Sequence, residues 1–232
     1  MQQDRSTRQK SSGKQRQQEA RKLLLARDHE ALKEWAAQDR APLRTLTSLL
    51  FDPDELVVYR AAEAFGVVIP DYSIEATRRQ LTNLFWMMND ESGALCWHAP
   101  EAIAEILVAK PELANEFGRV LLSFIVEEPF EASVCWAISR LSTIDSAEIL
   151  QDNFRFVLPE LTRWLDRSEP RLRGMAVLAF RALRRTSAVS KLEQMVEDDA
   201  RFSYYLPETG ELKETTVGQA AEEAASFLKS LG

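Results

Sequence analysis

The sequence is poor in residues that interrupt helices. Only eight glycines and nine prolines occur in 232 residues, which is few for an all-β protein of this size. Alanine, leucine, glutamate and arginine are abundant instead, and these residues favour helices. The chain is 45% hydrophobic, which suffices to bury a sizeable core as one domain or as one continuous solenoid. We therefore expect a globular protein that is helical throughout.

Cysteines and long apolar runs are also scarce. Cys96 and Cys135 are too few and too far apart for the disulfide framework of a small secreted domain, so reduced thiols are expected. No run approaches the roughly 18 apolar residues of a membrane span, and the N-terminus lacks an apolar signal region. These absences predict a cytoplasmic protein without a membrane partner.

Negative charge dominates, but it is unevenly distributed. The formal net charge is −7, whereas residues 1–22 carry seven Lys or Arg against Asp4 and Glu19, a net +5, so the remaining chain carries −12. Because nucleic-acid affinity depends largely on neutralising phosphates with cations, the acidic body predicts no nucleic-acid partner. Residues 1–15 have almost nothing apolar to bury and are predicted to form a disordered basic tail, either merely solvated or a weak anion-docking arm. A single domain is expected over residues 16–232.

One pattern recurs along the chain. An apolar helix face leads to an acidic, proline-containing turn, and a second helix follows with small residues facing the core. The segment LTSLLFDPDELVVYRAAEAFG, residues 46–66, is followed by copies at 81–107, 120–141 and 158–183. The alanines that mark successive second helices are 35 to 45 residues apart. These spacings lie around the period of roughly 40 residues in HEAT-type repeats. These alanines are Ala64, Ala102, Ala137, Ala179 and Ala224.

The first copy carries the most specific motif, an Asp-Pro turn followed by Val57 and the run AAEAFG at residues 61–66. This motif resembles HEAT-like repeat proteins, particularly the branch named after phycobilisome lyases, and the resemblance covers about residues 43–231. It implies an all-α, right-handed α-solenoid of about five HEAT-like helical hairpins, in which each pair of helices contacts mainly its neighbours. Such repeats occur in enzymes, adaptors and scaffolds alike, so the fold does not decide the function.

Two segments depart from the repeat. Residues 19–38 are predicted to form one amphipathic N-terminal capping helix, with Leu24, Leu25, Leu32 and Trp35 as its apolar stripe. Residues 201–217 alternate aromatic and polar side chains around a Pro- and Gly-containing turn, which predicts a small β-hairpin insertion near the C-terminus. That hairpin either marks a binding edge or covers the end of the solenoid. Helical spacing among leucines also predicts a core role for Phe51, Trp86, Met87, Trp164 and Phe180.

The second helices are predicted to share a polar and aromatic surface. Aligning Ala99 and Ala102 with the corresponding alanines of the first repeat places side chains of three repeats side by side. We predict a concave groove suited to a peptide segment or a flat ligand. Pro100 removes a backbone donor there, so the second helix is either kinked or begins near Ala99. The predicted groove residues are Tyr59, Arg60, Glu63, Trp97, His98, Glu101, Glu105, Trp136 and Arg140.

The groove leaves two interpretations of function open. The first is a non-catalytic interaction module, a scaffold or assembly factor that binds a protein partner. The alternative is a ligand- or metal-dependent enzyme that uses the Trp97, His98 and Glu101 cluster, such as the tetrapyrrole (bilin) lyase that the resemblance implies. Cys96, His98, Glu101 and Cys135 are competent ligands for zinc or iron. No C-x-x-C or H-x-x-x-H spacing supports them, so neither metal nor cofactor is predicted, and the oligomeric state is not determined by the sequence.

Overall fold

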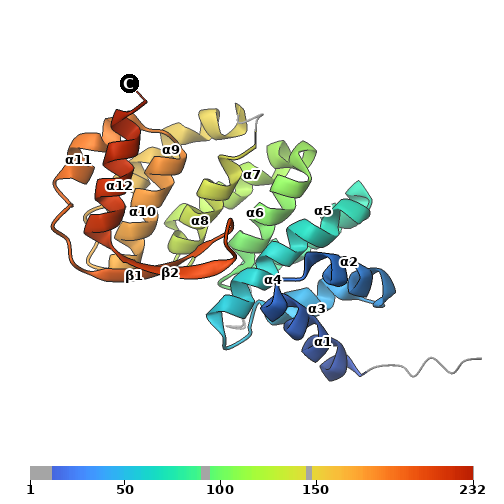
Figure 1. Cartoon of the computed structure of the whole chain (residues 1–232). Coiled ribbons are helices and arrows are strands. Elements are labelled where there is room, and N and C mark those ends of the chain that lie inside the picture. The colour runs from blue at the N-terminus through green and yellow to red at the C-terminus, as the bar shows by residue number, and fades with distance from the viewer. Residues whose placement is uncertain (1–11, 90–94, 145–147, 232) are drawn as a thin grey trace, which may run out of the picture.

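The computed structural model describes residues 12–89, 95–144 and 148–231, with the backbone alone for residues 148–155. Within these ranges the chain forms twelve α-helices and a two-stranded sheet (Figure 1). No helix of the described part is both long and apolar enough to cross a membrane. The α-helices are α1 (Gly13–Ala26), α2 (His29–Gln38), α3 (Pro42–Leu49), α4 (Glu55–Val68), α5 (Ile74–Met88), α6 (Ala99–Ala109), α7 (Ala114–Ser123), α8 (Glu131–Leu141), α9 (Glu148–Trp164), α10 (Pro170–Ala182), α11 (Val189–Glu193) and α12 (Val217–Lys229).

The second helices of the repeats form a continuous row. Helix α4 packs against α6, α6 against α8, α8 against α10, and α10 against α12. The five alanines that mark the repeat each lie on one of these helices and are at most 1% exposed. Small side chains at these positions let neighbouring helices approach closely, since a larger residue would overpack the contact. The row is the structural core of the molecule.

The first helices form an outer layer on this row. Helices α1 and α3 pack on α4, α5 and α7 pack on α6, α9 packs on α10 and α11 packs on α12. Each helix pair therefore contacts mainly its neighbours, as in a solenoid. The prediction of a helical repeat solenoid with a C-terminal β-hairpin is confirmed.

The N-terminal cap differs from the prediction, because two helices replace the single predicted helix. Arg27 adopts a left-handed backbone conformation with φ 51° and ends α1. The Asp28 side chain then accepts a hydrogen bond from the Ala31 amide at 2.9 Å and caps α2. The prediction of a disordered tail is wrong for residues 13–15, which form the first turn of α1 capped by Ser12. The rest of that tail, residues 1–11, lies outside the described residues.

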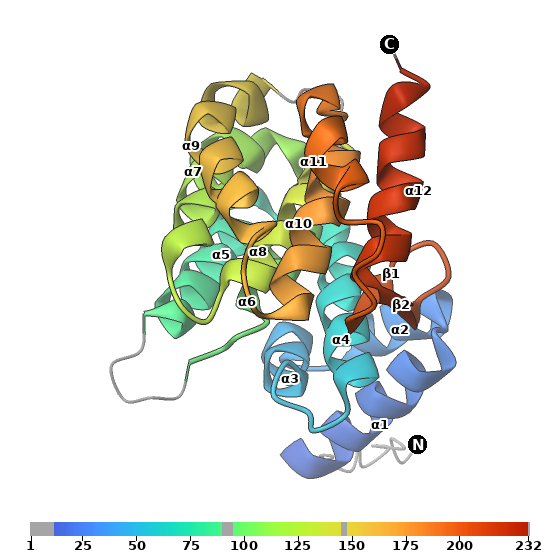
Figure 2. The same cartoon turned by 90° about the vertical axis from the view of Figure 1, so that its left-hand side faces the viewer.

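The β-hairpin consists of β1 (Arg201–Leu206) and antiparallel β2 (Glu211–Thr216). Gly210 has φ 71° in the turn, a conformation that glycine adopts without steric cost. The hairpin packs on α10 and α12 at its base. Figures 1 and 2 show that it extends from there along the row of second helices toward the N-terminal helices. It therefore crosses the repeats, whereas the sequence suggested only an end cover or a binding edge.

The aromatic core prediction is correct for two residues and wrong for two others. Trp164 and Phe180 are 2% and 3% exposed, as expected. Trp86 is 75% exposed, because it points away from the buried stripe of α5 that includes Leu84. Phe51 is 50% exposed in the turn after α3. Spacing among leucines thus does not reveal which aromatic side chains face the neighbouring repeat.

Candidate functional site

The hairpin lies directly on the aromatic residues of the predicted groove. The ring of Tyr205 from β1 is stacked on the ring of Tyr59 from α4, with centroids 5.1 Å apart and planes 2° apart. Trp136 of α8 donates a hydrogen bond from Nε1 to the Tyr205 carbonyl at 3.2 Å. Its ring centroid lies 6.0 Å from that of Tyr59. Aromatic pairs in such offset arrangements stabilise beyond their area burial, so the hairpin is firmly seated here.

The tip of the hairpin is held by Arg60, which is almost fully buried. Its Nε donates to the Gly210 carbonyl at 2.9 Å, and its Nη2 to the Glu211 carboxylate at 2.6 Å. Its Nη1 also donates to the Leu25 carbonyl at 2.7 Å, near the end of α1. A single guanidinium thereby joins α1, α4 and the hairpin, a task that suits its rigid set of five donors.

A second ionic cluster holds the other side of the tip. Arg27 donates to Glu63 at 2.6 Å and also to the carbonyl of Pro207. The Tyr205 hydroxyl donates to the same carboxylate at 2.7 Å. Burial by itself would raise the pKa of Glu63, but these hydrogen bonds and the Arg27 charge outweigh it, so the pKa is lowered. Glu63 is therefore ionised and committed to internal contacts at neutral pH.

A third ionic contact joins two of the predicted groove residues. Arg140 and Glu105 form a bidentate contact, with Nε–Oε1 at 2.6 Å and Nη2–Oε2 at 3.1 Å. The guanidinium also lies 6.0 Å from the centroid of the Trp136 ring. Such planar pairing satisfies both partners geometrically, so neither side chain is left free for a ligand.

The prediction of an open groove is wrong for most of its residues. The exposed fraction is 5% or less for Tyr59, Arg60, Glu105 and Trp136, and 0% for Glu101. The physical reason is that the hairpin contacts Tyr59 through a ring and accepts hydrogen bonds from Trp136 and Arg60 through its carbonyls. The two glutamates are instead paired with His98 and Arg140. The structure does bring residues of α4, α6 and α8 together, but beneath the hairpin.

Trp97 and His98 lie at the edge of the region that the hairpin covers. Helix α6 begins at Ala99 with Pro100 in its first turn, so the unkinked alternative is correct. Trp97 is 60% exposed, and its carbonyl accepts a hydrogen bond from Ser133 Oγ at 3.0 Å. This bond fixes the Trp97 backbone against the first turn of α8. Trp97 is thus an exposed aromatic side chain on an anchored backbone.

His98 is paired with a fully buried carboxylate. Its Nδ1 lies 3.2 Å from Glu101 Oε1, and its ring meets Tyr59 edge-on at 5.5 Å. Burial lowers the pKa of His98, but the charge and hydrogen bond of Glu101 outweigh it, and the pKa is raised. Glu101 Oε2 is buried and has no hydrogen-bond partner among the described residues. The pair therefore leaves one carboxylate oxygen unsatisfied.

The two thiols considered as metal ligands are buried. Burial raises the pKa of Cys96 to about 12 and that of Cys135 well above its ordinary value. Both side chains are 0% exposed. In the described part of the chain, no group of three or more His, Cys, Asp or Glu side chains is placed to hold a metal ion. The cysteines have the character of small buried apolar residues.

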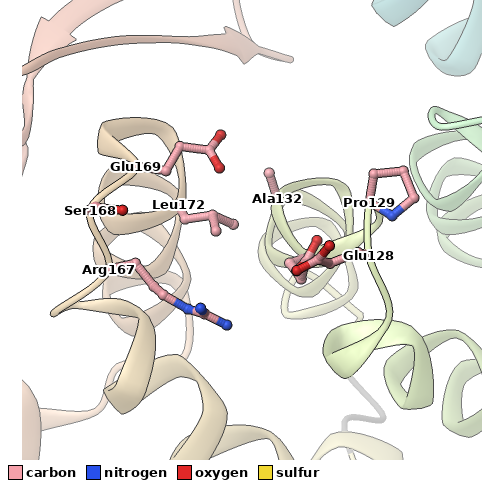
Figure 3. A pocket seen from close by; sticks show the side chains of 8 residues that line it. Glu128, Pro129, Ala132, Arg167, Ser168, Glu169 and Leu172 are labelled. Atoms are coloured by element: carbon pink, nitrogen blue, oxygen red, sulfur yellow. The ribbon is translucent and has the colours of Figure 1, made fainter.

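Two clefts open beside the hairpin at the N-terminal ends of the second helices. The first, here called the acidic cleft, has a volume of about 340 Å³ and lies between the starts of α8 and α10 (Figure 3). The second, the hairpin cleft, has a volume of about 440 Å³ and lies between the start of α10 and the hairpin. The two share Glu169. The acidic cleft is lined by Glu128, Pro129, Glu131, Ala132, Arg167, Ser168, Glu169 and Leu172.

The clefts differ in how their charges are satisfied. In the hairpin cleft, Arg171 pairs with Glu55 at 3.0 Å and Arg201 with Glu214 at 3.0 Å. In the acidic cleft, three glutamates and Arg167 form no ion pair with any described residue. Sequence reasoning missed this cleft, although the turns EEPFE, 127–131, and DRSEP, 166–170, carry acidic residues just before two second helices. Those turns are the signal that could have revealed it.

Sequence comparison finds a partial relative of this chain. No family model matches the chain. An uncharacterized protein of Archaeoglobus fulgidus is 36% identical over 110 residues, which are 47% of this chain and 56% of that protein. The match thus spans little more than half the length of that relative.

Solved structures are similar to this chain over most of its length. Two engineered proteins, 16% and 19% identical, align with a TM-score of 0.56 over 96% of this chain and 94% and 95% of theirs. A designed armadillo repeat protein, 18% identical, aligns with a TM-score of 0.51 over 96% of both chains. The chain therefore has the fold of an armadillo-like repeat α-solenoid. The resemblance to the phycobilisome lyase branch stays a prediction.

Proposed function

We propose that the chain is a non-catalytic interaction module, a scaffold or assembly factor that binds a segment of a partner polypeptide. The binding surface is the edge formed by Trp97, the acidic cleft and the hairpin cleft. The observation that carries the proposal is Trp97, which is 60% exposed while its carbonyl is held by Ser133 of α8. Tryptophan is among the residues that contribute most to protein interfaces, and an anchored backbone reduces the entropy lost on binding.

The arrangement of the clefts favours an extended segment. They share Glu169 and both lie at the start of α10, while Trp97 adjoins the first turn of α8. A chain that followed this edge would contact successive repeats, which is how solenoids present extended binding surfaces. Half of the residues that line the acidic cleft are charged, whereas pockets for small ligands are mostly apolar.

Contacts within the buried part of the predicted groove hold the residues beside this edge in place. The ring of His98 contacts Tyr59, and the ring of Tyr59 is stacked on Tyr205. Tyr59 is only 2% exposed to solvent. The Tyr59 hydroxyl accepts a hydrogen bond from Arg171 of the hairpin cleft at 2.9 Å. These contacts fix the residues that surround the edge before any partner arrives. Rigid support of this kind favours affinity because less order must be created on binding.

The test uses peptides selected from a random display library on the purified full chain. The dissociation constant of each selected peptide is measured by fluorescence anisotropy for the natural protein and for Trp97→Ala. We expect Trp97→Ala to weaken binding about tenfold or more. The matched control is Phe156→Ala, which removes an aromatic side chain that is 48% exposed on the outer helix α9. If no peptide is selected, or if both variants bind equally well, the proposed function is wrong.

A second candidate is a ligand- or metal-dependent enzyme, such as a tetrapyrrole lyase-like protein, that uses His98 and Glu101. One observation favours it: Glu101 Oε2 is buried without a donor from the described residues. An unsatisfied buried acceptor costs about 1–3 kcal/mol, and such costs tend to occur at functional sites. Neither residue lines the two clefts, however. A stoichiometric chromophore or metal in the purified protein, lost on His98→Ala, would establish this candidate in place of the interaction module.

A further inference from the structure

We propose that the acidic cleft receives one cationic side chain, arginine or lysine, of the bound polypeptide segment. This inference rests on the proposed function and names the chemistry that the partner must carry.

The charges that line the acidic cleft are unbalanced. Glu128 and Glu131 come from the start of α8 and Glu169 from the residue before α10, so the carboxylates belong to two repeats. Figure 3 shows Arg167 reaching into the space between the helices opposite Glu128. With three glutamates and one arginine, the lining has a formal net charge of −2. A cation of the partner would reduce this negative charge.

Glu131 is the most buried of the three glutamates that line the cleft. Only 9% of this residue is exposed, its side chain lines the cleft, and it forms no ion pair within the described residues. Burial raises the pKa of Glu131; its own amide and Arg167 oppose the rise, while Glu128 and Glu169 add to it. A cation bound in the cleft would favour the ionised form of this carboxylate, so the cleft suits a positively charged group.

Hydrogen bonds hold the backbone on both sides of the acidic cleft. Arg173 donates to the carbonyls of Arg167 and Ser168 at 2.7 and 2.9 Å and pairs with Asp198 at 2.8 Å. This holds the turn on the α10 side. On the α8 side, the amide of Phe130 donates to the Glu127 carbonyl at 2.8 Å. The backbone that carries the glutamates is therefore fixed before binding, which reduces the entropy lost when a charged head group binds.

The acidic cleft has an apolar part as well as a charged one. Pro129, Ala132 and Leu172 give the cleft an apolar part, which suits the methylene stem of a long cationic side chain. Its charged head can then reach the carboxylates. A bare divalent ion needs about six or more oxygen ligands, and the described residues offer no cluster that could hold one. An organic cation on a flexible stem fits both parts of the cleft.

The experiment uses the same display library on the full-length chain and on the full-length variant Glu131→Gln. Peptides selected on the natural protein should be enriched in arginine or lysine at one position, and the enrichment should disappear on the variant. Replacing that arginine by citrulline, or that lysine by norleucine, should weaken binding to the natural protein about tenfold and leave binding to the variant unchanged. Glu169→Gln, which changes an exposed residue, is the second variant and should behave alike. The control for net charge is Glu222→Gln on α12, an exposed glutamate far from the cleft in sequence.

The outcomes separate the two proposals. Peptides that depend on Trp97 but show no preference for a cation, and that bind Glu131→Gln as tightly as the natural protein, would overturn this inference and leave the proposed function standing. Failure to select any peptide would overturn both. Loss of binding on Glu222→Gln equal to that on Glu131→Gln would also overturn the inference, because the effect would then reflect overall charge.

Discussion

The ring of Tyr205 in the hairpin lies parallel to the ring of Tyr59 in α4, with centroids 5.1 Å apart. These residues belong to opposite ends of the repeat array. In a simple solenoid each repeat contacts only its neighbours, and stability is a sum of neighbouring terms. The hairpin adds contacts between the last repeat and the first. We therefore infer that it couples the two ends of the array during unfolding.

Removal of the Tyr205 side chain tests this coupling. The residue is 1% exposed and its hydroxyl donates to Glu63 at 2.7 Å. We expect Tyr205→Ala to lower the free energy of unfolding by about 3–5 kcal/mol, as for other large aromatic truncations. Tyr205→Phe keeps the ring stack and loses only the hydrogen bond, so a loss of about 1–2 kcal/mol is expected. Urea denaturation followed by circular dichroism measures both, and equal losses would show that the stack contributes nothing.

Gly174 in α10 provides a second test of hairpin docking. A Cβ at this position would clash with the ring of Phe202 in β1. Alanine normally stabilises a helix interior by about 1 kcal/mol relative to glycine. We nevertheless expect Gly174→Ala to destabilise the protein by about 1–3 kcal/mol through overpacking. Combining it with Phe202→Ala in a double-mutant cycle should recover part of the loss.

The control for this substitution is Gly13→Ala at the start of α1. The nearest atom to a Cβ there, outside the neighbouring residues and backbone, is Arg16 Nη2 at 3.9 Å, an ordinary contact. Gly13→Ala should therefore leave stability unchanged or slightly raised. If Gly174→Ala behaves in the same way, the Phe202 ring does not pack on α10 as described.

The His98–Glu101 pair predicts a pH dependence of stability. The pKa of His98 is raised in the folded protein, so the folded state holds the proton more tightly than the unfolded state. Its stabilising contribution is complete below the ordinary histidine pKa of about 6.5 and is lost as the pH rises through the folded value. Tyr59, Glu55 and Arg171 also act on this group. Their effect on the pKa of His98 is the same in the natural protein and in a variant that differs only at Glu101.

The measurement is the free energy of unfolding between pH 5.5 and 9 for the natural protein and for Glu101→Gln. The natural protein should lose stability with rising pH by more than the variant does, because His98 has no carboxylate partner at position 101 in the variant. Parallel profiles would show that the pair does not hold a proton in the folded state.

Buried thiols predict slow alkylation. Because the pKa of Cys96 is raised to about 12, its thiolate fraction at pH 8 is roughly a thousandfold below that of a free cysteine. Cys135 is equally buried. We expect both thiols to react with a disulfide reagent only after urea unfolds the chain. Ser187→Cys places a thiol at an exposed position and should react at once, and rapid labelling of the unmodified native protein would contradict the burial of the natural pair.

Local patterns in the sequence were sufficient for the repeat. Helical periodicity and the recurring alanines identified the second helices. Each alanine faces an adjacent helix, and the pattern that shows this lies within a single helix. Alternation around a turn identified the hairpin, and the restriction that proline imposes on a helix reduced α6 to two alternatives, a kink or a start near Ala99. The structure shows the second. Each of these features depends on residues close together in the chain.

The position of the hairpin depends on contacts between residues far apart in the sequence. Its contacts join Arg60 to Gly210 and Tyr59 to Tyr205, pairs separated by most of the repeat array, and no local pattern records such a meeting. Its docking buries most of the groove that the sequence predicted to be open. The same docking leaves Trp97 and the acidic cleft as an accessible edge of the second-helix row. The repeating unit follows from residues close together in the sequence, whereas long-range packing sets which of its faces meets solvent.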